Sequence, residues 1–278
     1  MATDPVTPAE SPPRHLRLGG VPVFVYHGLT SSAETEMPLR ERKYWVSMSK
    51  FQGHLNEIQA EGYRVTLLRE LWNPTDTLNS EKPVVVLTFD DGRTSDYQVA
   101  YPLLLEAGVR ADFFVNTATI SKPGFLNWQH IAEMQRAGMS FQSHGHDHVD
   151  LSRLPLHALE WQLGNSKHLL EDRLGCAVDF LAVPYGLLDR RVVEVALQVG
   201  YRAVCTSWSW PARPGVRTVN RIAVYRHTTL REFQRLLLGS PVCYAARTAR
   251  TVFLYLPKHL LLRFWPNRLG VRILEEQT

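Results

Sequence analysis

"PVVVLTFDDG", residues 83–92, joins a continuous apolar run to two adjacent aspartates and a glycine. The run is apolar at successive positions, which is typical of a strand buried on both faces in a parallel sheet. Asp90 and Asp91 end the run, although neighbouring carboxylates repel each other and Asp is a poor strand residue. The stretch predicts a buried parallel strand whose carboxyl end carries either a functional pair of acids or a surface Asx-type turn.

The segments on both sides of this strand alternate short apolar runs with amphipathic stretches. The expected strands are residues 21–28, 83–89, 111–116, 139–144, 178–183 and 201–206, and the expected helices are residues 47–63, 95–108, 127–138, 155–175, 190–200 and 229–239. No glycine-rich phosphate loop follows the first strand. The pattern favours the α/β class, and within it a barrel rather than a dinucleotide-binding sheet.

Composition limits the class of protein. The chain has 278 residues, 45% of them hydrophobic, which suffices for one large domain or two small ones. Its three cysteines are far apart, so neither a disulfide framework nor a Cys-type zinc site is indicated, and a reduced intracellular setting fits. No run of 18 or more uncharged apolar residues occurs, which argues against a membrane-spanning helix.

The two ends of the chain differ in composition from the middle. Residues 1–20 are polar and proline-rich and lack the apolar stretch of a secretory signal peptide, so we expect a disordered leader and a cytoplasmic location. Residues 21–239 form the expected main domain, and residues 240–278 form a basic, apolar extension. Two interpretations of the extension stay open: helices that pack on the barrel, or an amphipathic segment at the inner face of an anionic membrane. Nucleic-acid binding is not expected, because no recognised motif accompanies the basic residues.

Polar residues follow three of the expected strands. They are Asp90 and Asp91, the pair His144 and His148, and the string "VPYG" at residues 183–186. The carboxyl ends of barrel strands are where reactive groups gather. Two histidines and one carboxylate, with open positions for water, suit a catalytic divalent ion, although solvated or core histidines also have this spacing. Neighbouring side chains at a strand end point different ways, so one aspartate can bind the ion while the other faces the substrate.

Together, "TFDDG", "SHGHDHVDL" and "VPYG" resemble the motifs of the polysaccharide deacetylase family, the NodB-homology domain of carbohydrate esterase family 4. The likeness covers roughly residues 21–239. It implies a distorted (β/α) barrel of seven strands, to which this chain adds a C-terminal helical extension. It also implies removal of N- or O-acetyl groups from sugars with a bound divalent metal, expected to be Zn²⁺, with Co²⁺ or Ni²⁺ as alternatives.

The resemblance assigns roles to individual residues. Asp90 corresponds to the general base, and the metal ligands correspond to Asp91, His144 and His148. The family usually has Thr or Ser after the first histidine, and Gly145 stands there in this chain. His146 fits no ligand position, so we expect it at the rim of the site.

Departures from the family pattern narrow the subfamily. The third motif commonly reads R-P-P-Y-G, but Ala182 replaces its arginine, which orients the catalytic aspartate. Similar strings occur in a branch that resembles the poly-N-acetylglucosamine deacetylases, as do "GYRAVCT" at residues 200–206 and "VNRIAVYRHTTLREF" at residues 219–233. We hypothesise that Arg221, in the second of these strings, replaces the missing arginine.

The histidine general acid of the family's last motif has no counterpart after residue 206. The string "VPVFVYHGL" near the start resembles the "P-V-L-x-Y-H" string of the same branch, where the acid comes from the first strand, so His27 is our candidate. A histidine satisfied at a strand end is the alternative. The backbone N–H of Tyr185 is the candidate donor to the oxyanion.

The expected reaction is therefore hydrolysis of an acetamide on an N-acetylglucosamine-type glycan or lipid-linked precursor. An O-acetyl esterase, a carbohydrate-binding pseudoenzyme and a metal-independent amidohydrolase are the alternatives. The tryptophans that are candidates to stack on a sugar ring are Trp45, Trp128, Trp208 and Trp210. The sequence carries no prediction of oligomeric state.

Overall fold

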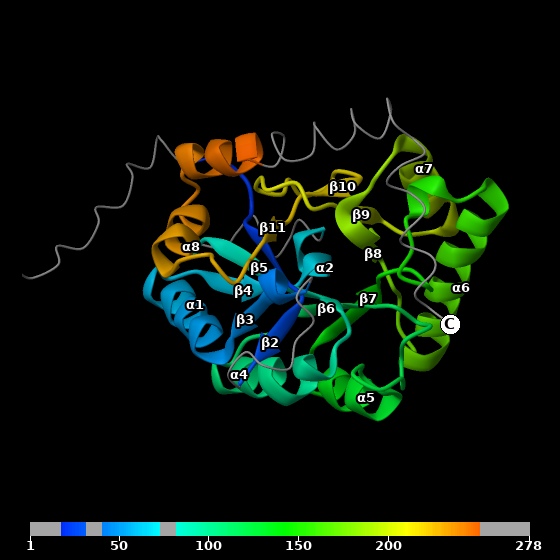
Figure 1. Ribbon diagram of the computed structural model, residues 1–278, viewed down its shortest axis with the longest axis horizontal. Coiled ribbons are helices and arrows are strands. Elements are labelled where there is room, and N and C mark those ends of the chain that lie inside the picture. The colour runs from blue at the N-terminus through cyan, green and yellow to red at the C-terminus, as the bar shows by residue number, and fades with distance from the viewer. Residues whose placement is uncertain (1–17, 32–40, 73–81, 251–278) are drawn as a thin grey trace, which may run out of the picture.

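A parallel sheet with helices packed outside it forms the centre of the computed structural model, which describes residues 18–31, 41–72 and 82–250 (Figure 1). Six strands lie side by side in the order β9, β8, β7, β6, β5, β1, and every neighbouring pair is parallel. Their bounds are β1 Val23–Tyr26, β5 Val84–Asp91, β6 Asp112–Val115, β7 Ser140–Ser143, β8 Phe180–Ala182 and β9 Ala203–Cys205. These six strands fall within the six predicted strand segments, apart from the last two residues of β5.

One short segment joins the two ends of this sheet. Strand β10, Thr218–Val219, pairs with β9, and strand β11, Ile222–Ala223, pairs with β1 on the opposite side. Only two residues separate β10 from β11, so the segment closes the sheet into a distorted barrel, as predicted. If β10 and β11 are counted as one position, they and the six strands above make the expected seven strand positions of the barrel. The sheet nevertheless contains nine strands, because β4, Arg64–Thr66, also pairs with the start of β5.

The helices follow their sequence signals closely. The longer ones are α1 Met48–Ala60, α5 Trp128–Arg136, α6 Leu156–Leu174, α7 Arg190–Val199 and α8 Leu230–Leu237. Side chains of Ser47, Asn127, Asp189 and Thr229 accept hydrogen bonds from the free amides at four of their N-termini. The helix predicted at residues 95–108 starts as a π-helical turn, Asp96–Ala100, before α4, Tyr101–Glu106. The short helix α2, Leu68–Leu71, and the strand pair β2, Gly28–Thr30, with β3, Trp45–Ser47, were not predicted separately.

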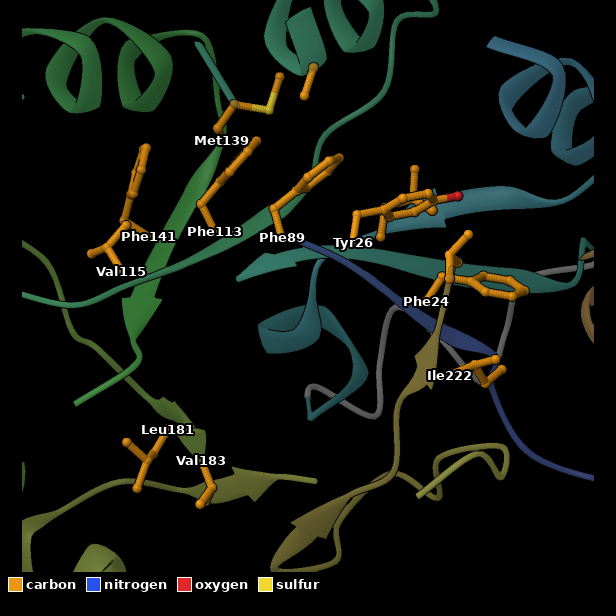
Figure 2. Packing of buried hydrophobic residues seen from close by; sticks show 14 of the residues in the cluster. Phe24, Tyr26, Phe89, Phe113, Val115, Met139, Phe141, Leu181, Val183 and Ile222 are labelled. Carbon is orange, nitrogen blue, oxygen red and sulfur yellow. The ribbon is translucent and has the colours of Figure 1, made fainter. Parts of the chain in front are cut away.

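A row of aromatic rings crosses the outer face of four strands (Figure 2). Tyr26, Phe89, Phe113 and Phe141 are register partners on β1, β5, β6 and β7. The ring centroids of successive members lie 5.3, 4.9 and 5.5 Å apart. Rings at this separation gain contact energy beyond their burial, so the row fixes the register of the strands beneath the helices.

Strand β5 has two buried faces, and this decides where its aspartates lie. Val85, Leu87 and Phe89 belong to the outer core under the helices, whereas Val86 belongs to the inner core. Because side chains alternate along a strand, Asp90 continues the inner face. Its carboxylate is therefore placed inside the barrel, and the next residue begins the turn at the rim.

The predicted extension is described only in its first part. Residues 241–250 are helical, and buried Tyr244 donates a hydrogen bond to the carbonyl of Leu236 at 2.8 Å. Residues 251–278, like the leader at 1–17, lie outside the described residues, so the predicted domain limits stay predictions. Within the described ranges, no helix has the length and hydropathy needed to cross a membrane.

Candidate active site

A pocket of about 380 Å³ opens at the carboxyl ends of the strands. Six of the seven predicted site residues line it: His27, Asp90, Asp91, His144, His148 and Tyr185. The seventh, Arg221, is not a lining residue and contacts Asp90 from within the barrel. The fold thus brings together residues that are far apart in the sequence.

The turn after β5 has an unusual backbone. Asp91 has φ of +80° and Gly92 has φ of +67°, a region that residues with a side chain rarely adopt. A Cβ atom on Gly92 would lie 2.9 Å from Cγ1 of Val115, so the position admits only glycine. The strained turn rotates Asp91 away from the regular alternation of the strand and towards the two histidines.

Asp91, His144 and His148 form a candidate metal site. Oδ1 of Asp91 lies 3.5 Å from Nε2 of His144 and 3.4 Å from Nε2 of His148. One ligand atom from each of the three residues lies within 4.8 Å of the other two. Nδ1 of His144 donates to the carbonyl of Ala182 at 2.9 Å, which leaves Nε2 with a lone pair directed at the site.

The chemistry of these donors fits a divalent ion. Oδ1 of Asp91 is buried and has no hydrogen-bond partner among the described residues. Burial raises the pKa of Asp91, but its close contact with Nε2 of His144 and the nearby histidines outweigh burial, so the net pKa lies below the ordinary value and the carboxylate is ionised. Burial lowers the pKa of His148 to about 4, which keeps that imidazole neutral. Two imidazoles and one carboxylate are a ligand set typical of catalytic zinc.

Asp90 is held by a buried arginine. Nη1 and Nη2 of Arg221 lie 2.7 and 2.8 Å from the two carboxylate oxygens of Asp90. Nε of Arg221 donates to the carbonyl of Thr206 at 3.2 Å, and the guanidinium lies over the ring of Phe114. Burial raises the pKa of Asp90, but the charge of Arg221 outweighs it and the net pKa lies below the ordinary value. Asp90 is therefore an oriented, ionised carboxylate.

Two serine hydroxyls hydrogen-bond to the loop that carries His144 and His148, although the hydroxyl that the family usually has after the first histidine is missing. Gly145 has φ of +81°, which disfavours the Thr or Ser that the family usually has there. Its N–H donates to Oγ of Ser143 at 3.1 Å, and its carbonyl accepts from Oγ of Ser166 at 3.0 Å. The amide of Asn116 donates to the carbonyl of His144 at 2.6 Å. The loop is thus supported from three sides.

His146 lies outside the metal-ligand triplet and is not a pocket-lining residue. Its Nδ1 lies 2.7 Å from the hydroxyl of Thr117 and 3.1 Å from the amide of Asn165. Its ring packs edge-on against Trp161, with centroids 4.8 Å apart. Its contacts brace the outer side of the loop.

His27 follows directly after β1 and faces the pocket. Its ring lies 4.7 Å from the ring of Tyr44, and its Nδ1 has no hydrogen-bond partner in the described ranges. Withdrawal from water lowers the pKa of His27, and the charges of Asp91 and Asp90 oppose that shift. His27 is thus a pocket-lining imidazole with one unpartnered ring nitrogen, within the electrostatic influence of two carboxylates.

Tyr185 also has a strained backbone, with φ of +61°. Its hydroxyl donates to the carbonyl of His148 at 3.0 Å, and its ring lies edge-on to the imidazole, 4.5 Å between centroids. Of the four candidate tryptophans only Trp45 lines the pocket.

Some lining residues were not predicted. Nη2 of Arg93 lies 3.0 Å from Oε2 of Glu41 and 3.6 Å from Oδ2 of Asp91. Tyr44 and Tyr225 add aromatic surface. Arg93 was detectable in principle, because it follows the aspartate turn by two residues. Glu41 and Tyr44 lie in no recognised motif, and Tyr225 lies in the string quoted for residues 219–233 but was not singled out there.

The fold and the site define an α/β barrel with a candidate metal centre at the carboxyl ends of its strands. Residues 77–204 match the family model described as polysaccharide deacetylase. This match agrees with the family resemblance that the motifs predicted.

Two curated relatives are also named as deacetylases. The chain is 28% identical over 189 residues to YxkH of Bacillus subtilis (strain 168), whose name gives a provisional assignment as a polysaccharide deacetylase. It is 25% identical over 175 residues to the poly-beta-1,6-N-acetyl-D-glucosamine N-deacetylase of Staphylococcus aureus (strain MRSA252). These alignments cover 67% and 58% of this chain, and 64% and 60% of the relatives' own length. The chain thus spans less than two thirds of either curated relative.

A solved structure extends the comparison to the whole barrel. The Streptococcus pyogenes deacetylase PplD in complex with acetate superposes with a TM-score of 0.70 at 25% identity. The match covers 80% of this chain and 98% of that one.

Proposed function

We propose that the protein is a metal-dependent deacetylase that removes acetyl groups from N-acetylated sugars. The observation that carries the proposal is one pocket in which the Asp91, His144 and His148 triplet adjoins an ionised carboxylate, Asp90, clamped by Arg221. A binding module needs no buried, oriented carboxylate beside a metal-ligand set. The match to the family model supports the same chemistry.

Asp91, His144 and His148 would hold the ion. A divalent metal bound there supplies Lewis-acid polarisation of the acetyl carbonyl and lowers the pKa of a bound water. The remaining steps belong to side chains of the chain itself.

Asp90 is the proposed general base. It is ionised, and both of its oxygens are fixed by Arg221, so the carboxylate faces the pocket in one orientation. As water attacks the acetyl carbon, Asp90 accepts the water proton. The new negative charge on the carbonyl oxygen is stabilised in part by the backbone N–H of Tyr185, presented by the strained turn.

His27 is the proposed general acid. The departing sugar amine is a poor leaving group as an anion and requires a proton as the C–N bond breaks. The lowered pKa of His27 makes its imidazolium a stronger acid, but the neutral ring must first gain a proton. Asp90, which has just accepted one, lines the same pocket.

The proposed substrate unit is N-acetylglucosamine. The name of the Staphylococcus aureus relative supports this sugar, and the aromatic lining of Trp45, Tyr44 and Tyr225 suits the apolar face of a pyranose ring. The pocket volume of about 380 Å³ accommodates a unit of this size.

Acetate release from N-acetylglucosamine oligomers tests the proposal. Protein loaded with Zn²⁺ is expected to release acetate, chelated protein is not, and re-addition of Zn²⁺, Co²⁺ or Ni²⁺ restores release. An O-acetylated glycan assayed in parallel distinguishes amide from ester preference. Equal rates before and after chelation would contradict the metal-dependent mechanism.

The membrane contact predicted for residues 240–278 is a separate proposal. Co-sedimentation with anionic liposomes, with and without these residues, tests it, and equal sedimentation of both forms would rule it out. A helical extension that only packs on the barrel predicts that equal result.

A further inference from the structure

Aromatic rings extend from the pocket in a line away from the metal site. The ring of Tyr44 contacts that of His27, and the ring of Tyr225 lies 5.7 Å from that of Tyr44. The ring of His227 continues the line, 5.4 Å from Tyr225 and nearly parallel to it at 4°. Tyr44 and Tyr225 line the pocket, and His227 is exposed beyond it. The line therefore leads from the reacting group to the protein surface.

Positive charge accompanies these rings. Nζ of Lys43 lies over the ring of Tyr44, 4.6 Å from its centroid. Nζ of Lys50 contacts the carbonyl of Arg226, and the amide of Arg226 donates to the carbonyl of Lys43, so the two lysines belong to one local structure. We call the rings of Tyr44, Tyr225 and His227, with Lys43, Lys50 and Arg250, the cationic shelf.

Within the part of the chain that the structure describes, the lysines of the shelf are not paired with acids. Lys43 and Lys50 form no ion pair with any described residue. Partial burial and the charge of Arg250 lower the pKa of His227, and the charge of Glu232 opposes that shift. The neighbouring acids are occupied, because Glu232 pairs with Arg247 at 2.7 Å and Glu41 with Arg93 at 3.0 Å. A cationic surface whose lysines form no ion pair within the described ranges attracts anionic ligands.

The sign of this charge discriminates between substrate classes. A polymer of N-acetylglucosamine is neutral, and each deacetylation adds a protonated amine, so the product chain would be repelled by the shelf. A phosphate or diphosphate on the sugar would instead be attracted, since lysine ammonium groups bind phosphate oxygens as point charges. The rings between the cations and the pocket leave a path for the sugar.

We propose that the cationic shelf binds the phosphate of a phosphate-linked N-acetylated sugar, such as a sugar 1-phosphate or a glycosyl diphosphate. This inference rests on the proposed deacetylase function and specifies its substrate class. The sugar occupies the pocket, and its phosphate contacts Lys43 and Lys50.

Two matched substrates test the inference: N-acetylglucosamine 1-phosphate and methyl N-acetylglucosaminide, which lacks the charge. The double variant Lys43→Gln/Lys50→Gln is expected to lose roughly tenfold or more in kcat/KM on the phosphate, mainly through KM. On the methyl glycoside it changes by less than about twofold. The control variant Arg173→Gln/Arg190→Gln, which removes two exposed cations from α6 and α7, leaves both substrates unchanged. Equal losses of the Lys43→Gln/Lys50→Gln variant on both substrates, or no loss on either, would overturn the proposal.

A binding measurement separates this inference from the proposed function. Calorimetry with glucosamine 1-phosphate on metal-free protein reports the shelf alone, with tighter binding expected for the wild type than for the Lys43→Gln/Lys50→Gln variant. Such binding without acetate release from either substrate would contradict the deacetylase function and retain the shelf. Absence of binding would contradict phosphate binding by the cationic shelf and would not contradict the proposed deacetylase function.

The other anionic source is a lipid headgroup. Phosphatidylglycerol vesicles are expected to co-sediment equally with the wild type and the Lys43→Gln/Lys50→Gln variant. If the variant loses vesicle binding while its kinetics on N-acetylglucosamine 1-phosphate are unchanged, the shelf binds a membrane and the proposal is wrong.

Discussion

The guanidinium of Arg221 contacts both carboxylate oxygens of Asp90, at 2.7 and 2.8 Å, inside the barrel. The planar arrangement of its N–H groups matches a carboxylate, so the pair fixes direction as well as charge. In the family motif that this chain resembles, the equivalent arginine stands at the position of Ala182, the last residue of β8. Arg221 contacts Asp90 as predicted, although it lies between β10 and β11 rather than on β8. Its catalytic role is open to test.

Arg221→Ala is expected to lower kcat by at least about tenfold to a hundredfold, because Asp90 loses its orientation and is left as a buried unpaired charge. The same loss destabilises the fold by about 3–5 kcal/mol. Steady-state kinetics and urea denaturation measure the two effects. Arg221→Lys retains the charge but not the two-pronged contact, so partial recovery of stability without full recovery of kcat is expected. An unchanged rate in Arg221→Ala would refute the role.

Substitutions of the two adjacent aspartates are expected to have different effects on metal content and turnover. Asp90→Asn retains the metal and loses turnover by a factor of about 10² to 10⁴, because the base is gone while the ligands remain. Asp91→Ala loses the metal, because one of three protein ligands is removed. Metal analysis after dialysis, beside acetate release, separates them. The opposite pattern would reverse the two roles.

Replacement of His27 is expected to depend on the leaving group. His27→Gln should lower amide hydrolysis by about 10² to 10⁴, because the amine needs a proton as it departs. Hydrolysis of 4-nitrophenyl acetate should fall much less, because nitrophenolate leaves without protonation. Rates on both substrates, measured with the metal site filled, make the comparison. Equal losses on the amide and the ester would assign His27 to another task.

Asp112 predicts a pH dependence of stability remote from the pocket. Its buried carboxyl accepts the amide N–H of Leu68 at 2.8 Å, and burial raises its pKa from 3.8 to about 6. The folded state therefore holds this proton more tightly than the unfolded state. The stabilisation is complete below about pH 4 and is lost as the pH rises through 6, a loss of about 3 kcal/mol by pH 8.

Asp112→Asn removes this titration and keeps an oxygen for Leu68. The variant is expected to gain up to about 3 kcal/mol of unfolding free energy over the wild type at pH 8 and little at pH 4. Urea denaturation of both proteins at pH 4, 6 and 8 measures the difference. A difference that stays constant with pH would show that Asp112 is already ionised at pH 4 in the folded protein.

Much of the fold was predictable, because its long strands and helices have strong periodicity. Strand β5 was identified by apolar residues on both faces, and the structure buries both faces. The closing strands β10 and β11 have two residues each, too few to show any alternation. Strand β4 has three, and its pairing with β5 depends on tertiary contacts alone.

The candidate site was predictable where motifs place it. Asp90, Asp91, His144 and His148 lie at strand ends, where barrel chemistry concentrates. Tyr44 and Tyr225 were not identified, because the two residues meet only when two distant loops are brought together by the barrel. Glu41 was missed because its partner, Arg93, comes from the turn after β5.

The segment of residues 218–223 that closes the barrel also carries Arg221 between its two short strands. The metal-ligand triplet, in contrast, depends on β5, β7 and the loop after β7. A molecule in which this segment has detached would keep its three candidate metal ligands in place and lose the arginine that orients Asp90. Metal content and turnover therefore report on different parts of the barrel. A fraction of the protein that contains metal but is inactive is expected where residues 218–223 have not paired with β9 and β1.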